Sequence, residues 1–60
     1  MDQLFSQGTR VEYRNHQGDT CQGMVERVEG AGPQTRYTIK NEKNQQWEQV
    51  EHSHVDRRLQ

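Results

Sequence analysis

Apolar and polar residues alternate along much of this chain, and the alternation predicts short β-strands joined by polar turns. Val11 and Tyr13 alternate with charged neighbours, which is typical of a half-buried strand over residues 9–14. The same pattern recurs over residues 36–40, where a tyrosine and an isoleucine are the apolar positions. Residues that favour turns separate the segments, at 15–19, 30–34 and 41–44.

The segment after the first turn departs from strict alternation. Val25 and Val28 are three residues apart, so they lie on opposite faces of a regular strand. A β-bulge near residues 26–27 would insert one extra residue and turn both valines toward the core. Gly23 marks either a close approach of another backbone or the start of a bend. We therefore expect a long, strongly bent second strand over residues 21–29.

The end of the chain fits two interpretations. A fourth strand carries Trp47, and Val50 is out of phase with it, so this strand is expected to end or kink just before Val50. In the first interpretation, residues 52–54 form one turn of 3-10 helix and residues 55–59 form a fifth strand. In the second, residues 50–59 form a short helix. The strand is favoured, because ten residues that include valine, histidine and serine make a weak helix.

Composition limits the size and class of the protein. Sixty residues bury only about 60% of their unfolded surface, so the chain holds one small domain and excludes a large catalytic α/β fold. No apolar run is long enough to span a membrane. A single cysteine, Cys21, excludes an internal disulfide, and no signal-peptide pattern opens the chain. We therefore expect a cytoplasmic location.

The chain divides into a short N-terminal tail, residues 1–7, and one domain, residues 8–60. The tail carries Leu4 and Phe5, and the second strand carries Met24. The five-strand scheme does not assign these apolar side chains to the core. They are expected either to cover one end of the domain or to form a patch for self-association.

The pattern of strands resembles a small SH3-like barrel of the Tudor and KOW type over about residues 8–59. The resemblance rests on four stretches, Gly8-Thr9-Arg10-Val11-Glu12-Tyr13, Gly23-Met24-Val25, Tyr37-Thr38-Ile39 and Trp47 with Val50. It implies an all-β, five-stranded barrel with a short 3-10 turn before the last strand. It also implies a binding module, since Tudor-like members hold methylated side chains in aromatic cages, KOW-like members bind RNA or ribosomal and transcription partners, and others dock proteins or self-assemble.

Three of the four aromatic residues lie on different expected strands. Tyr13, Tyr37 and Trp47 would either converge on one face, as a platform or cation cage, or fill a core that has few aliphatic residues. The loop after the first strand offers His16 and Asp19 but no aromatic to complete a Tudor-like cage. The favoured function is therefore a non-enzymatic module that binds a protein, or a second copy of itself, through this aromatic face.

Nucleic-acid binding is the alternative function. Basic residues of the first, third and fifth strands would form a stripe that meets phosphates beside the stacking aromatics. The residues of this stripe are Arg10, Arg14, Lys40, Arg57 and Arg58. Interleaved carboxylates and a net charge of −1 argue against a general nucleic-acid binder.

Neither catalysis nor a metal or other cofactor is expected. His52 and His54, with His16 or Cys21, offer ligands to zinc, but neighbouring histidines in an exposed link usually titrate freely. Cys21 has no orienting group or oxyanion loop that would make it a nucleophile. The chain is similar in length and strand pattern to the type II dihydrofolate reductases. It lacks their Val-Gln-Ile-Tyr stretch, in whose place stands Gln46-Trp47-Glu48-Gln49-Val50.

Overall fold

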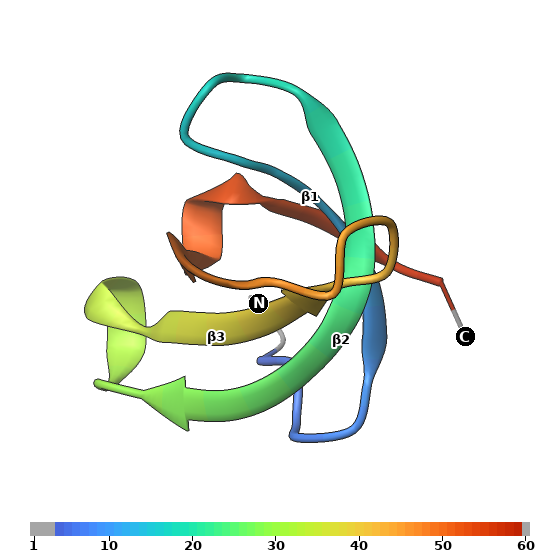
Figure 1. Cartoon of the computed structure of the whole chain (residues 1–60). Helices are drawn as coiled ribbons and strands as arrows, with labels where there is room; N and C mark the ends of the chain where they lie inside the picture. Colours follow the sequence, from blue (N-terminus) through green and yellow to red (C-terminus); the bar gives the residue numbers. More distant parts are fainter. Residues whose placement is uncertain (1–3, 60) are drawn as a thin grey trace.

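Five antiparallel strands make up the fold of residues 4–59, the part of the chain that this computed structural model describes (Figure 1). The strands are β1 (Arg10–Arg14), β2 (Thr20–Glu29), β3 (Arg36–Asn41), β4 (Trp47–Glu51) and β5 (Val55–Arg58). They lie in the order β4-β3-β2-β1-β5, so β5 returns to the free edge of β1. Within residues 4–59 the ladder stays open, because no pairing joins β4 to β5.

Short turns of 3-10 helix connect two pairs of strands. They are η1 (Gly32–Gln34), between β2 and β3, and η2 (His52–His54), between β4 and β5. The predicted link and last strand are therefore confirmed, and the alternative helix over residues 50–59 is wrong. No helix in the described part of the chain has the length and apolar character needed to cross a membrane.

β2 is the long bent strand that the sequence predicts, and Figure 1 shows it curving across the sheet. Val25 pairs with Ile39 whereas Arg27 pairs with Thr38, so one extra residue bulges between them. The close approach at Gly23 is also confirmed, because a Cβ atom there would collide with the carbonyl oxygen of Lys40 and lie 2.7 Å from a methyl group of Ile39.

The expected burial of Val28 is wrong. The bulge does set Val28 opposite Tyr37, hence on the core-facing side of the sheet. Val28 nevertheless remains 38% exposed. It lies near the end of β2, where it lines a shallow hollow with Leu4 and Phe5 instead of joining the core.

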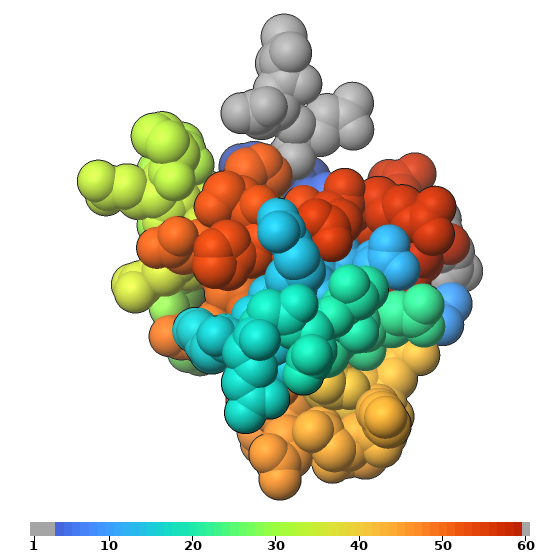
Figure 2. Space-filling view, turned by 90° about the horizontal axis from the view of Figure 1, so that it is seen from above, coloured from blue at the N-terminus to red at the C-terminus, as the bar shows by residue number. Residues whose placement is uncertain are grey.

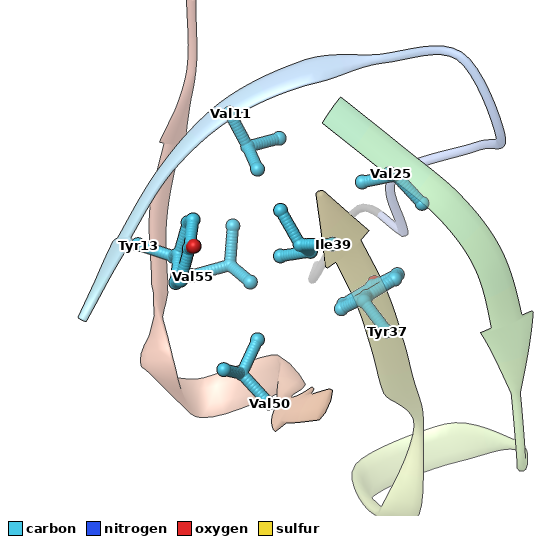
Figure 3. Close-up of a cluster of buried hydrophobic side chains, with 7 residues drawn as sticks. All are labelled: Val11, Tyr13, Val25, Tyr37, Ile39, Val50 and Val55. Atoms are coloured by element: carbon cyan, nitrogen blue, oxygen red, sulfur yellow. The ribbon is translucent and has the colours of Figure 1, made fainter. Parts of the chain in front are cut away.

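The core consists of seven side chains contributed by all five strands (Figure 3). They are Val11, Tyr13, Val25, Tyr37, Ile39, Val50 and Val55. β1 and β3 each contribute two core residues that are two positions apart, as the alternation requires, and each of the other strands contributes one. The seven core residues are therefore all β-branched or aromatic, and such residues suit a pleated surface.

β4 runs unbroken to Glu51, so the expected end or kink before Val50 is wrong. Val50 pairs with Tyr37 of the core, while Trp47 pairs with Lys40, whose side chain faces outward. An interval of three residues places two side chains on opposite faces of a regular strand. The strand stays regular because only the valine enters the core.

Part of the N-terminal segment packs on the domain. Of the expected tail, residues 1–3 lie outside the described residues. Phe5 is half-buried, with its ring centroid 5.9 Å from that of Tyr37 and 6.0 Å from that of His52. Its backbone N–H donates to the Tyr37 hydroxyl at 3.2 Å, and this hydroxyl lies 2.9 Å from Nδ1 of His52. Phe5 thus covers one end of the core.

Candidate protein-interaction surface

An exposed row of side chains crosses the outer face of the sheet. Strand register aligns Met24 on β2, Lys40 on β3 and Trp47 on β4. Trp47 is 65% exposed and Met24 is 44% exposed. The ammonium nitrogen of Lys40 lies 5.8 Å from the centroid of the indole ring, within cation–π range. We call these three residues the outer row.

The three aromatics proposed from the sequence as a binding face do not come together. Tyr13 and Tyr37 are completely buried and face the core, as Figure 3 shows. Trp47 faces solvent from the other side of the sheet. The alternative interpretation, in which the tyrosines fill the core, describes their placement, and Trp47 is the one of the three that remains exposed.

The basic residues are dispersed among carboxylates. Arg10 forms a two-pronged ion pair with Glu42, whose second contact joins Nη2 to Oε1 at 3.1 Å. This hydrogen bonding lowers the pKa of the Glu42 carboxyl and raises the pKa of the Arg10 guanidinium. The other guanidinium of β1 forms a longer, single ion-pair contact, with 3.6 Å between Nε of Arg14 and Oδ1 of Asp56.

β5 carries two more residues of the predicted stripe. Arg57 lies 3.0 Å from Glu12, its register partner on β1. Arg58 is the next residue and pairs with Val11, so the two arginines fall in different rows of the ladder. Lys40 lies on β3, in the outer row, with β1 and β2 between it and β5. The structure therefore does not gather the predicted basic residues into a continuous stripe.

A hollow of about 1,100 Å³ lies between the turns that follow β1 and β3. Figure 2 shows the first turn in cyan beside the second in amber. Asn15 organises the first turn, because its Oδ1 accepts hydrogen bonds from the backbone N–H groups of Gln17 and Asp19, both at 2.9 Å. Asn41 organises the second and accepts from the N–H of Lys43 at 2.8 Å. Both walls of the hollow are thus fixed by asparagine side chains.

Two buried polar atoms belong to Glu48, which lines this hollow, and to Tyr13, which lies in the core and does not line it. Glu48 pairs with Ile39, so its side chain lies on the core-facing side of β4. Among the described residues, neither Oε1 of Glu48 nor the hydroxyl of Tyr13 has a hydrogen-bond partner. Burial raises the pKa of Tyr13, and the neighbouring Glu48 carboxylate adds to the shift. Sequence reasoning missed this pair, although the inward phase of Val50 places Glu48 on the same face.

The histidines and Cys21 have separate neighbours. Nε2 of His16 lies 2.9 Å from the carbonyl oxygen of Gln49, while Nδ1 of His52 contacts Tyr37. Cys21 receives a weak contact from Asn15, with 3.5 Å between Nδ2 and Sγ. No group of three or more potential metal ligands occurs among residues 4–59.

Comparison of the chain with protein-family models, with curated proteins and with solved structures finds no match.

Proposed function

We propose that the chain is a small non-enzymatic module that binds another protein through the outer row. The observation that carries this proposal is the exposure of Trp47, at 65%, in a chain with only one tryptophan. A domain with a seven-residue core has few large apolar side chains, yet its largest one faces solvent. Tryptophan is strongly enriched among the residues that dominate the binding energy of protein interfaces.

The neighbours of Trp47 suit the same purpose. Met24 is flexible and polarizable, so it adapts to an apolar partner surface. Lys40 adds a positive charge that a partner carboxylate can meet. All three side chains lie on paired strands, and a backbone already fixed in a sheet loses little freedom on binding.

We also propose that the sheet forms an SH3-like barrel. Three features support this: the order β4-β3-β2-β1-β5, the strongly bent β2 and the single 3-10 turn between β4 and β5. In this architecture the outer row lies on the outside of the barrel and the core side chains fill its interior.

Protein binding is favoured over nucleic-acid binding by the charges. Three of the five predicted phosphate-binding residues already form ion pairs with carboxylates, and phosphate would have to compete with these partners. Negative groups beside each guanidinium would also repel a polyanion. The charged surface therefore fits a protein better than DNA or RNA.

The test compares the wild type with Trp47→Ala and a matched surface control, Gln34→Ala in η1. Each form is immobilised on a solid support and incubated with extract from the source cell. Each protein that the wild type retains is then purified, and calorimetry gives its Kd for all three forms. We expect Trp47→Ala to raise the Kd by roughly thirtyfold or more, as for an interface hot spot, and Gln34→Ala to leave it unchanged. Dispersed amide signals in NMR spectra verify that both variants fold.

Two results would overturn the proposal. In the first, Trp47→Ala binds every retained protein as tightly as the wild type does. In the second, only nucleic acid is retained, and its affinity falls steeply between about 50 mM and 200 mM salt, as counterion release requires. The second result would make the module a nucleic-acid binder.

A further inference from the structure

The second half of β2 has a free edge on the side where β1 ends. The register pairs β1 with β2 no further than Met24. Val25 is still bonded on this side, since its carbonyl oxygen accepts from the N–H of Gly8 at 2.7 Å and its N–H donates to the carbonyl oxygen of Thr9 at 2.9 Å. Beyond Val25, no described residue forms a backbone hydrogen bond with this side of β2. The strand continues from there alongside β3 only.

Val28 presents unpaired backbone groups at this edge. The N–H of Asn41 donates to the carbonyl oxygen of Gln46 at 2.8 Å, so alternate residues of β3, Tyr37 among them, direct their backbone groups toward β4. Val28 is the register partner of Tyr37, and its own N–H and C=O therefore point away from β3. No backbone group of the described residues bonds either of them. A strand from outside the chain can satisfy both.

The shallow hollow beside Val28 lies along the same edge and has a volume of about 720 Å³. Its apolar lining comes from Leu4, Phe5 and Val28, of which Leu4 is 56% exposed. Its charged lining is one residue of each sign, Glu26 and Arg27. A strand added here would cover apolar surface that the small core leaves in water.

We infer that two copies of the chain associate through this edge, with their β2 strands antiparallel and a two-fold axis at Val28. In this register the N–H of each Val28 donates to the C=O of the other, so both unpaired groups are satisfied. The same register sets Arg27 of each copy directly across from Glu29 of the other copy. The two hollows meet at the axis, where Leu4 and Val28 of both copies are covered.

The charges at this edge favour a second copy as the occupant. Arg27 and Glu29 flank Val28 and lie on the opposite face of the sheet from it. Within one chain their contact is long, at 3.5 Å, and the Arg27 side chain is 72% exposed. Opposite charges directly across an antiparallel pair are stabilising, whereas an edge with charges of one sign would repel its own copy. The alternation of sign about Val28 makes the edge complementary to itself.

This association is separate from the outer row. In the sheet, β3 and β2 stand between Trp47 on β4 and the edge that faces β1. The dimer therefore goes beyond the proposed function, and Trp47 stays exposed in both copies. Pairing only the ends of two strands makes a small interface, and small interfaces are weak and transient.

Sedimentation velocity at increasing protein concentration tests the inference. We expect monomer at roughly 10 µM and a substantial fraction of dimer at roughly 1 mM, as for a small interface. Arg27→Glu sets like charges across both cross-strand pairs, so it should raise the dimer Kd roughly tenfold or more. Lys43→Glu is the matched control, because it makes the same change of charge at an exposed site in the turn after β3. It should leave the Kd unchanged.

Two further variants fix the register. Arg27→Glu combined with Glu29→Arg in one chain exchanges the two charges, so it should restore the dimer that Arg27→Glu loses. Val28→Pro removes the N–H at the free edge and keeps the bonds to β3, so it should abolish dimerisation without unfolding the domain. Dispersed amide signals in NMR spectra verify that each variant folds. If Arg27→Glu does not fold, Glu29→Arg provides the like-charge variant.

Four results would overturn the inference. The wild type stays monomeric at the highest concentration, a folded like-charge variant dimerises as the wild type does, or the combined variant stays monomeric. In the fourth, Trp47→Ala abolishes the dimer, which would place the contact at the outer row instead. Because sedimentation uses the purified chain alone, its outcome and that of the binding test with Trp47→Ala are independent.

Discussion

β1 and the start of β4 use the two faces of the sheet in opposite ways. β1 turns Val11 and Tyr13 inward and its charged residues outward, the usual pattern of a half-buried strand. β4 begins with Trp47 in solvent and Glu48 on the core-facing side. Natural chains keep such departures from patterning mainly where function requires them. β1 thus serves folding, whereas the start of β4 carries Trp47, the residue on which the proposed binding surface depends.

The largest loss of stability should come from removing the aromatic side chain of Tyr13 on β1, and not that of Trp47 on β4. Tyr13→Ala leaves a cavity in a seven-residue core and is expected to lower the free energy of unfolding by about 3 kcal/mol or more. Trp47→Ala should lower it by less than about 1 kcal/mol, because the indole is mostly exposed. Urea denaturation followed by circular dichroism measures both. Equal losses would show that Trp47 is a structural residue and would remove the contrast between the strands.

The second effect concerns the buried phenol of β1 at high pH. Burial raises the pKa of Tyr13 above its unfolded value of 10.0. The folded state therefore keeps a proton that the unfolded chain releases, so stability is fully present below pH 10 and falls above it. The decline is at most about 1.4 kcal/mol per pH unit.

Denaturation curves at roughly pH 9 and pH 11 measure this decline, and Tyr13→Phe should flatten it because the variant has no hydroxyl to ionise. If Tyr13→Phe loses stability with pH as steeply as the wild type, another titrating group causes the loss of stability at high pH.

A smaller effect on stability should follow from replacing the inward-facing carboxylate of β4, Glu48, by an apolar side chain. Glu48→Leu removes a carboxylate oxygen that no described residue bonds and adds apolar contact inside. We expect the free energy of unfolding to rise by about 1 kcal/mol. Thermal unfolding provides the measurement, and Glu51→Leu on the exposed face is the control. A destabilised Glu48→Leu would instead mean that the carboxylate supports the fold.

The smallest effect should come from the exposed ion pair that joins β1 to the turn after β3. The hydrogen bond from Arg10 lowers the pKa of Glu42, so this contribution is present above the unfolded pKa of the carboxyl and is lost as pH falls through the folded value. Exposed pairs stabilise weakly, so Glu42→Gln should slightly reduce stability at neutral pH and have no effect at strongly acidic pH. Denaturation at both pH values checks this sign. A larger loss in acid would contradict it.

The sequence predicts the strands well because their signals are local. Alternation around Val11 and around Tyr37 identifies β1 and β3, and the three-residue interval from Val25 to Val28 locates the bulge in β2. Gly23 signals close backbone approach for the same reason, since a missing side chain is visible in the sequence. These features depend on neighbours along the chain and need no knowledge of strand pairing.

The candidate surfaces depend on long-range pairing and are harder to predict. Both Trp47 and Val50 are apolar, and the sequence does not state which of them enters the core. Pairing of Val50 with Tyr37 decides it, and the same register turns Glu48 inward. The contact of Phe5 with Tyr37 joins residues 32 positions apart and has no local signal.

The position of Trp47 has a practical consequence for spectroscopy. The only indole in the chain is mostly in water while the protein is folded, and it will be in water again once the chain unfolds. Its fluorescence should therefore change little across the unfolding transition. The two tyrosines, which leave a fully buried environment, are the intrinsic chromophores that report loss of structure. The tryptophan signal is left to report events at the outer surface.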